Sequence, residues 1–299
     1  MPELPEVEIV RRGLEPVLVG HRFARVEQRR PDLRFPFPDN FTGRLQGQTV
    51  RSLSRRAKYL VAHLSGGEVL VMHLGMTGRF TVQQPDKKEP RLLGEFTHDP
   101  GNDQAHDHIV FTMETGAKVT YNDPRRFGLM TLVPEQDLEA HKLFQGLGVE
   151  PLGNSLDAHY LAFKADGRTA DLKAFLMDQR IVAGLGNIYV SEALHRAHLS
   201  PNRRASSLAR QGRGNAVIPT ERAQRLVPAI RSVLEDAIHA GGSTLRDYRN
   251  ADGDLGYFQH NFAVYGREGE PCLTPGCRGI VRRTVQGGRS TFYCGVCQR

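Results

Sequence analysis

The sequence has no long run of uncharged apolar residues, and this absence already excludes a class of proteins. A membrane-spanning helix needs roughly 18 or more such residues in succession. The chain also lacks the basic start of a secretory signal peptide, because Glu3 and Glu6 make its opening acidic. We therefore expect a soluble protein that stays in the cytoplasm and has no membrane partner.

Cysteine is scarce as well, with only 4 residues in a chain of 299. A chain of this length can bury a sizeable core, so it has little need of disulfides, which are rare in proteins that are not exported. All four cysteines lie between Cys272 and Cys297. This clustering points to a metal site.

Acidic residues are outnumbered, since 40 Lys and Arg face 33 Asp and Glu, giving a net charge of +7. Such an excess suits a polyanionic partner, although many soluble proteins are merely basic. The hydrophobic fraction of 39% and the charged fraction of 24% are those of a globular chain. At roughly 150 residues per domain, the length favours about two domains.

The two halves of the chain differ in their apolar periodicity. Helical spacing from Pro5 to about Leu18 predicts a short N-terminal helix, and alternating segments then predict a β-rich half, most simply a sandwich. We expect strands at residues 22–27, 49–53, 59–64, 68–74, 79–82, 108–113, 118–121 and 129–133. The second half is helical, with helices expected at 134–144, 170–177, 187–196 and 220–240. Two polar stretches, 84–107 and the Arg-rich 203–215, are expected to be loops.

The cysteine spacing is the most specific motif. Cys272-x4-Cys277, sixteen residues and Cys294-x2-Cys297 describe two knuckles that can present four thiolates to one metal ion. This predicts one structural zinc per chain, with disulfides or free thiols as the alternative. Between the knuckles, Gly287-Gly288 precedes Arg289, and a glycine turn could bring that guanidinium to a phosphate or leave it at a solvated hairpin tip.

The N-terminus carries a candidate nucleophile. Once Met1 is removed, Pro2 has a free secondary amine that can attack a sugar C1′ and form an iminium, with Glu3 beside it to move protons. Taken alone, the same residues also match an ordinary flexible N-terminus without a catalytic role.

Three further motifs suit a nucleic-acid partner. Lys58 enters an apolar strand as either a general acid or a solvated edge residue. The turn containing Arg125 and Phe127 could wedge a base stack, unless Phe127 packs in the core. A glycine-rich turn before Asn187 opens a helix and could bind a phosphate.

Taken together these motifs resemble the formamidopyrimidine-DNA glycosylase family of base-excision repair. The resemblance runs the length of the chain, in family order, through Pro2-Glu3-Leu4-Pro5-Glu6, Arg55-Arg56-Ala57-Lys58-Tyr59-Leu60, His73-Leu74-Gly75-Met76-Thr77-Gly78, Asp123-Pro124-Arg125-Arg126-Phe127-Gly128, Leu176-Met177-Asp178-Gln179, Gly184-Leu185-Gly186-Asn187-Ile188-Tyr189 and Gly287-Gly288-Arg289-Ser290-Thr291-Phe292-Tyr293-Cys294.

The resemblance implies an α+β multidomain fold. A two-layer β-sandwich with a helix would occupy residues 1–147, a helical helix-two-turn-helix domain 148–262, and a zinc-finger β-hairpin with four cysteine ligands 263–299. The zinc ligands would be Cys272, Cys277, Cys294 and Cys297.

The resemblance also implies residue roles. Pro2 would be the Schiff-base nucleophile and Glu3 a proton donor, while Lys58 would donate a proton in β-elimination and Arg289 would serve δ-elimination. Glu6 would help hold the lesion. Contacts to DNA would come from His73, Met76, His106, Arg125, Phe127, Arg168, Asn187 and Arg289, with Met76, Arg125 and Phe127 filling the gap left by the extruded nucleotide.

Three departures from the family pattern are visible. The first knuckle has four intervening residues where two are usual, and the 84–107 stretch is longer than usual, which affects the placement of His106. A lysine-rich run is expected near Arg168, where the chain has Ala165-Asp166-Gly167.

The expected function is therefore a bifunctional DNA glycosylase and abasic-site lyase that removes oxidised purines, including 8-oxoguanine and formamidopyrimidines, from double-stranded DNA, and acts as a monomer. The related endonuclease VIII branch, which prefers oxidised pyrimidines, is one alternative. A non-catalytic zinc-finger protein that binds distorted nucleic acid is the other, because it would need the basic surface and the finger without Pro2, Glu3 and Lys58.

Overall fold

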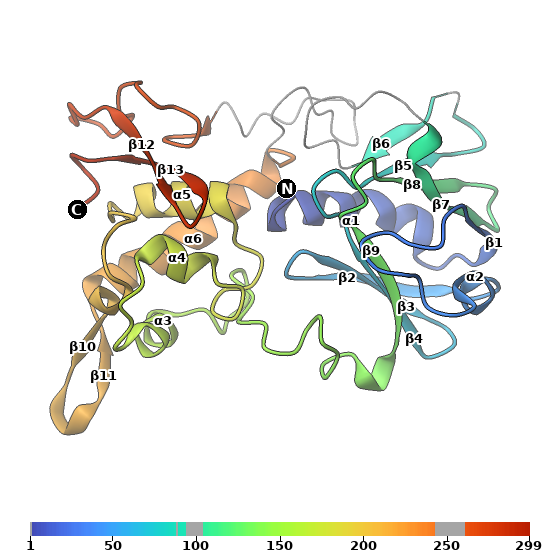
Figure 1. Cartoon of the computed structure of the whole chain (residues 1–299), viewed down its shortest axis with the longest axis horizontal. Coiled ribbons are helices and arrows are strands. Elements are labelled where there is room, and N and C mark those ends of the chain that lie inside the picture. The colour runs from blue at the N-terminus through green and yellow to red at the C-terminus, as the bar shows by residue number, and fades with distance from the viewer. Residues whose placement is uncertain (1, 88, 94–103, 243–260) are drawn as a thin grey trace. The chain divides into compact units, whose positions relative to one another are not determined.

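A computed structural model describes residues 2–87, 89–93, 104–242 and 261–299 (Figure 1). The chain forms two compact units. The first contains Met1–Gln145 and Ala240–Tyr257, and the second contains Gly146–His239 and Phe258–Arg299.

Two antiparallel sheets make up most of the first unit. One sheet has the order β1-β7-β8-β5-β6 and the other β2-β3-β4-β9. The strands are β1 (Phe23–Gln28), β2 (Val50–Arg56), β3 (Tyr59–Leu64), β4 (Glu68–His73), β5 (Arg79–Gln83), β6 (Arg91–Leu93), β7 (Asp107–Met113), β8 (Lys118–Asn122) and β9 (Leu129–Pro134).

The core of this unit lies between the sheets. Phe23 and Phe111 from one sheet share a buried cluster with Leu60 and Met72 from the other. The expected two-layer sandwich is thereby confirmed, and each of the eight expected strands is present with ends shifted by only a few residues.

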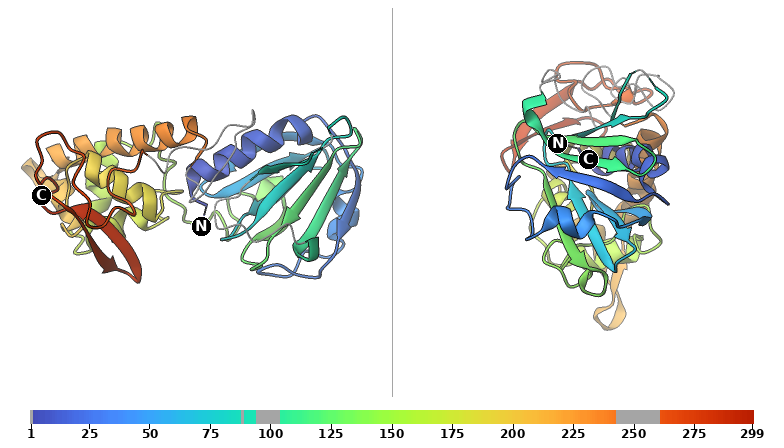
Figure 2. Two further views of the ribbon diagram at one scale, coloured as in Figure 1. Left: turned by 90° about the horizontal axis from the view of Figure 1, so that it is seen from above. Right: turned by 90° about the vertical axis from the view of Figure 1, so that its right-hand side faces the viewer.

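Helix α1 (Leu4–Leu18) runs along the sandwich and packs against β2, β3 and β6 (Figure 2). Its apolar residues Val7, Val10 and Leu14 are buried at helical spacing, as the sequence predicts. The Arg11 guanidinium also donates to the Leu53 carbonyl of β2 at 3.2 Å. Together these contacts fix the helix against the sheet that begins with β2.

The helix expected at 134–144 is wrong. After β9 the chain forms the 3-10 helix η2 (Glu135–Asp137) and then single turns, in which His141 N donates to Leu138 O and Phe144 N to His141 O. These are i to i+3 bonds, and Phe144 alone is buried near the end of the segment, against Tyr59. Without an apolar stripe to pack, no α-helix is stabilised.

Short elements also interrupt the two expected loops. Within 84–107 the structure has β6 and the 3-10 helix η1 (Gln104–His106), while residues 94–103 lie outside the described ranges. The 203–215 stretch contains η3 (Ala205–Leu208), β10 (Ala209–Gln211) and η4 (Arg213–Asn215). A further short helix, α2 (Phe41–Leu45), has no counterpart among the expected elements.

Helices dominate the second unit. They are α3 (Ala158–Ala165), α4 (Leu172–Met177), α5 (Asn187–Arg196) and α6 (Glu221–His239), and two hairpins accompany them, β10 with β11 (Val217–Pro219) and β12 (Val281–Gln286) with β13 (Arg289–Cys294). Asp157 and Asp171 cap α3 and α4 by accepting from the backbone nitrogens of Tyr160 and Ala174, both at 2.7 Å. Among the described helices, none is long and apolar enough to cross a membrane.

Candidate functional site

The start of α1 brings two buried carboxylates next to Pro2. Glu3 is the N-cap of the helix, and Glu6 in the first turn accepts a hydrogen bond from Glu3 N at 2.8 Å. Pro2 is buried, and Glu3 and Glu6 are only 3% and 2% exposed. The positive end of the helix dipole favours negative charge at this position. The candidate nucleophile therefore lies beside acidic groups that are shielded from water.

Lys58 lies in the turn between β2 and β3. This turn is tight, since Ala57 has a left-handed φ of 53° and its carbonyl accepts from Arg55 at 2.7 Å. Arg55 also pairs with Glu8 of α1 at 3.5 Å, which holds the turn alongside the first half of that helix. Lys58 is only 7% exposed. It is thus not a solvated edge residue.

His73 lies at the end of β4, where its strand position pairs with Tyr59. Burial, followed by the positive charges of Lys58 and Arg34, lowers the pKa of His73 to about 4. The backbone nitrogen of Gly75 donates to His73 Nδ1 at 2.9 Å. A neutral ring that accepts at Nδ1 carries its proton on Nε2, so His73 can act as an uncharged hydrogen-bond donor.

The candidate wedge is displayed by the turn between β8 and β9. Phe127 is 42% exposed and lies under the Arg125 guanidinium, 4.6 Å from the ring centre. Arg125 is exposed, and Met76, on the neighbouring turn after β4, is half-buried. Phe127 therefore does not pack in the core, and an aromatic ring and a cation are presented together to solvent.

Asp123 ties these two turns together. This fully buried carboxylate accepts from Thr77 Oγ1, from Gly128 N at 2.8 Å and from Tyr121 OH at 3.3 Å. Thr77 Oγ1 in turn accepts from Arg125 N at 3.3 Å. Asp123 opens the motif that contains Arg125 and Phe127, but the sequence alone predicts no role for it. An Asp that opens a Pro-initiated turn is a local signal that could have identified it.

A glycine in the turn after β4 allows that turn to lie against the turn between β8 and β9. Gly75 has a φ of +63°, and a Cβ added there would lie 2.3 Å from the Phe127 carbonyl carbon. The backbones of the two turns are therefore in direct contact, which only glycine permits here.

In the second unit, Asn187 begins α5 after a glycine-rich turn. Gln179 shapes that turn by accepting from Gly184 N at 2.8 Å and donating to Leu185 O at 2.7 Å. Asn187 Nδ2 donates to Ser290 O at 2.9 Å, so the start of α5 contacts the hairpin that carries Arg289. Sequence reasoning missed Lys173, a buried side chain that donates to the same Ser290 carbonyl at 3.0 Å.

Arg289 lies at the tip of the β12–β13 hairpin and is exposed. The two residues of the turn, Gly287 and Gly288, both have positive φ values of 56° and 75°. This is the pattern of a type I′ turn, for which glycine is well suited. The expected glycine turn is present, and it leaves the guanidinium open to a ligand.

The four cysteines come together at the end of this hairpin that is opposite its turn. Their sulfur atoms all lie within 4.8 Å of one another, and the pairs Cys272–Cys297 and Cys277–Cys294 are each 3.7 Å apart. Four sulfurs at about 2.3 Å from a tetrahedral zinc would be about 3.8 Å apart, so the donor set fits this metal. The backbone nitrogen of Gly279 donates to Cys277 Sγ at 3.3 Å, and the longer first knuckle does not prevent convergence.

Two further residues expected to contact DNA, His106 and Arg168, are placed by backbone hydrogen bonds. His106 ends η1, and its carbonyl accepts from Asp123 N at 3.1 Å, which places it beside the wedge turn. Arg168 lies exposed between α3 and α4. Its carbonyl accepts from Ser206 N at 3.3 Å.

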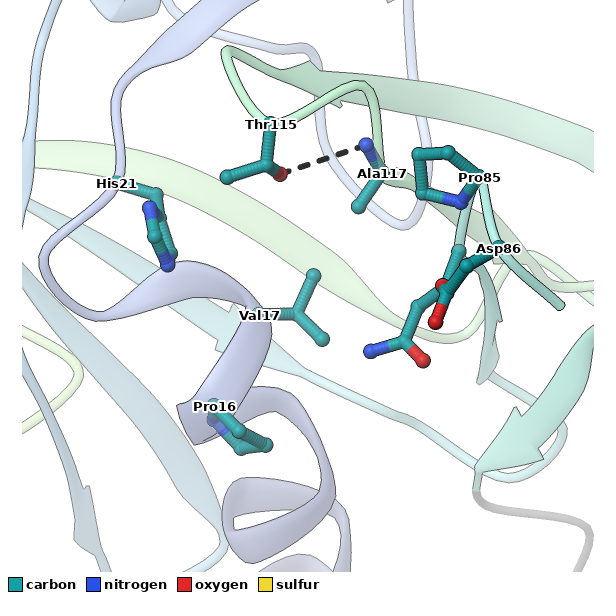
Figure 3. Close-up of a pocket in the computed structure, with 8 residues that line it drawn as sticks. Pro16, Val17, His21, Pro85, Asp86, Thr115 and Ala117 are labelled. Carbon is teal, nitrogen blue, oxygen red and sulfur yellow. Dashed lines mark hydrogen bonds between the residues drawn. The ribbon is translucent and has the colours of Figure 1, made fainter.

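A hollow at the other end of α1 is remote from these groups. Pro16, Val17, His21 and Asp86 line it together with the β7–β8 turn (Figure 3). A 15-residue helix is about 22 Å long, so the hollow lies far from Pro2. It does not belong to the candidate site.

Comparison with known proteins accounts for almost the whole chain. Three family models match it: the formamidopyrimidine-DNA glycosylase N-terminal domain at residues 1–130, the H2TH domain of the same enzymes at 147–249, and a zinc finger found in FPG and IleRS at 269–299. The chain belongs to the formamidopyrimidine-DNA glycosylase family. The expected assignment is therefore confirmed.

Relatives and solved structures agree with this membership. Formamidopyrimidine-DNA glycosylases of Beijerinckia indica and Methylocella silvestris are each 59% identical, over the full length of both chains. Lactococcus lactis FPG with Fapy-dG containing DNA matches with a TM-score of 0.82 at 30% identity, and with abasic-site DNA with a TM-score of 0.81 at 29% identity. Both matches cover all of each chain.

The zinc-finger model and the sulfur geometry together confirm one structural zinc, held by Cys272, Cys277, Cys294 and Cys297. A site closed by four thiolates has no open coordination position. The metal therefore stabilises the hairpin and takes no part in a reaction.

Proposed function

We propose that this member of the family is a bifunctional DNA glycosylase and abasic-site lyase that removes oxidised purines, including 8-oxoguanine and formamidopyrimidines, from double-stranded DNA. The observation that carries the proposal is the burial of Glu3 and Glu6 next to Pro2, at the start of a helix whose Glu8 pairs with Arg55 near the buried Lys58. A DNA-binding protein without catalysis has no need to bury these charges, because taking a charge out of water is costly.

The chemistry starts with the amine of Pro2. Its lone pair forms a bond to C1′ while the bond from C1′ to the damaged base breaks, and the base leaves with a proton. Glu3 is proposed to supply protons in this step, and Glu6 to help hold the lesion. The Pro2 nitrogen then loses its own proton, and the bond from C1′ to the ring oxygen O4′ breaks as that oxygen takes up a proton, which leaves an iminium. Because proline is a secondary amine, this iminium has no proton on nitrogen to lose, so it keeps its positive charge and acts as an electron sink.

The iminium then makes strand cleavage possible. Loss of a proton from C2′ expels the 3′ phosphate in β-elimination, and a second elimination expels the 5′ phosphate. Lys58 is proposed to donate a proton in the first elimination, and Arg289 to serve the second. The zinc has no step in this sequence.

Extrusion of the damaged nucleotide precedes this chemistry. A base inside the duplex is out of reach of an amine, and unstacking it costs a few kcal/mol. Met76, Arg125 and Phe127 are proposed to fill the gap, while phosphates bind His73, His106, Arg168, Asn187 and Arg289. We propose that the protein acts on DNA as a monomer.

Borohydride trapping on DNA with an abasic site tests the proposal directly. We expect a covalent adduct, and peptide mapping should locate it on Pro2. Excision should be faster on duplexes with 8-oxoguanine or formamidopyrimidine than on duplexes with oxidised pyrimidines. A preference for pyrimidines would place the protein in the endonuclease VIII branch, and the absence of any adduct would favour a non-catalytic binder.

A further inference from the structure

Six arginines around the β10–β11 hairpin have no role in the proposed reaction. They are Arg203, Arg204, Arg210, Arg213, Arg222 and Arg225, which we call the arginine surface. Arg203 and Arg222 are half-buried, and the other four are exposed. Within the described ranges, none of the six forms an ion pair with an Asp or Glu side chain, although Arg203 Nε donates to an oxygen of Arg299, the last residue, at 3.2 Å.

Five of these arginines line two hollows. One, of about 680 Å³, is lined by Arg210, Arg222 and Arg225. The other, of about 510 Å³, is lined by Arg203 and Arg204 together with Asn202 and three serines. Glu221 is the one acidic residue that lines either hollow. Both are thus strongly positive.

The two hollows are neighbours. Burial lowers the pKa of Arg203, and the positive charge of Arg222 lowers it further. Thr220 Oγ1, in the lining of the first hollow, donates at 3.0 Å to the carbonyl of Ser207, in the lining of the second, so the hollows adjoin. The charges of Arg203 and Arg222 are thus near each other, and Glu221 is the one acidic side chain that lines either hollow. Such an arrangement is unfavourable in the free protein and becomes favourable when anions bind.

Backbone hydrogen bonds fix the segments that carry the arginine surface. Arg210 pairs with Ile218 in the β10–β11 ladder, and Thr220 N donates to Leu208 O at 2.9 Å, which joins the hairpin to the start of α6. Leu172 N donates to Arg203 O at 2.7 Å, so the preceding segment is bound to α4. The hairpin itself projects from the helices of its unit (Figure 1).

The arginine surface is also continuous with the zinc-finger hairpin. Gln286, which pairs with Arg289 across the hairpin turn, donates to Pro201 O at 3.5 Å. Pro201 directly precedes the segment with Arg203 and Arg204. A duplex that contacts Arg289 could therefore continue onto the arginine surface.

We propose that the arginine surface binds backbone phosphates of duplex DNA outside the lesion, on one flank only. The inference rests on the proposed function in taking damaged DNA as the partner. A one-sided contact follows because the six arginines all lie in or next to one hairpin of the second unit, from Arg203 before η3 to Arg225 on α6. It would add affinity that does not depend on sequence, because phosphate contacts release counterions whatever the bases are.

The test compares binding to three duplexes that contain a tetrahydrofuran abasic-site analogue. One has short arms of about five base pairs, and the others extend one arm or the other to about fifteen. The variant is Arg210→Gln/Arg225→Gln, which removes two exposed guanidiniums. On one of the two extended duplexes we expect binding about tenfold weaker than wild type, and a plot of log K against log salt shallower by roughly two units.

Controls separate charge from folding. The variant Arg22→Gln/Arg25→Gln removes two exposed arginines that pair with Glu114 and Glu27 in the first unit, and it should bind all three duplexes as wild type does. Arg210→Lys/Arg225→Lys should keep the wild-type salt slope, because lysine retains the charge. Equal loss on all three duplexes, or no loss on any, would overturn the inference.

Trapping and excision on the short duplex, measured in parallel, keep the two proposals apart. Normal trapping with no effect of arm length would overturn only the arginine surface. A one-sided effect of arm length without trapping would overturn only the catalytic proposal.

Discussion

Charged side chains in the first unit differ widely in exposure. Arg22 and Arg25 are 55% and 70% exposed, whereas Glu3, Glu6 and Lys58 are buried. A charge on the surface is solvated at little cost, but a buried charge must be compensated by its neighbours. The sequence alone does not distinguish these groups, because a Lys before an apolar strand has the same local pattern in both situations.

His73 provides a prediction about pH at the residue scale. Its pKa is lowered to about 4 from a usual value of 6.5, so the unfolded chain binds more protons between these values than the folded chain does. Stability linked to His73 is therefore fully present above about pH 6.5 and is lost as the pH falls toward 4. Replacing His73 with Gln should reduce the loss of unfolding free energy between pH 7 and 5 by about 1–2 kcal/mol.

Urea unfolding of wild type and variant at both pH values measures this difference. His21→Gln is the control, because His21 lies in the same unit at the other end of α1. An unchanged pH dependence in His73→Gln would contradict a neutral His73 in the folded protein.

Phe127 provides the second prediction at this scale. Because the ring is exposed and stacked under Arg125, Phe127→Ala should leave the fold intact and remove part of the wedge. Compensation for unstacking is worth a few kcal/mol, so we expect excision from duplex DNA to fall by about tenfold to a hundredfold. Cleavage of a preformed abasic site should fall much less. Equal losses on both substrates, measured in single-turnover assays, would instead indicate a structural role.

At the scale of elements, the zinc hairpin combines a metal site with a displayed side chain. Cys294 ends β13, and Arg289 begins the same strand. Loss of one thiolate leaves an incomplete ligand set, and structural zinc contributes directly to local folding. Cys294→Ser should therefore lose its zinc and weaken DNA binding by at least about a hundredfold, while the sandwich remains folded.

Elemental analysis should show one zinc per wild-type chain and close to none in this variant. Circular dichroism should retain the β-sheet signal. A metal-free protein that keeps full activity would contradict a positioning role for the zinc.

The elements also show what the sequence could predict. Strands such as Tyr59–Leu64 were predicted with correct limits, because a β-branched apolar run bounded by a turn is a local signal. The zinc site was predicted from cysteine spacing for the same reason. The helix expected at 134–144 was wrong, because Phe144 packs on Tyr59 far away in the chain. Asp123 and Lys173 likewise act through partners 46 and 117 residues away, which periodicity cannot reveal.

At the scale of the whole molecule, the proposed reaction needs both compact units. Pro2, Glu3 and Lys58 belong to the first, and Asn187, Arg289 and the zinc to the second. The structure groups the finger with the helices in one unit, and the division into three domains at 1–147, 148–262 and 263–299 stays a prediction. Phosphate contacts are distributed over the chain, whereas the covalent step depends on one nitrogen atom. Binding and chemistry should therefore be separable.

Processing of the N-terminus offers that separation without any substitution in the folded part of the chain. While Met1 is attached, the Pro2 nitrogen is a tertiary amide whose lone pair is delocalised into the Met1 carbonyl, so it cannot form an iminium. We expect protein that retains Met1, as verified by intact mass, to bind damaged DNA about as well as the processed form. It should give no borohydride adduct and no strand cleavage above background.

Processed protein that begins at Pro2 should be trapped on abasic-site DNA, with the adduct mapped to the N-terminal peptide. Mixing the two forms in known ratios should give adduct in proportion to the processed fraction, which excludes an inactive preparation as the cause. Equal trapping by a verified Met1-retaining form would move the nucleophile to another amine, with Lys58 the next candidate because it is a buried amine in the turn that Arg55 joins to Glu8 of α1.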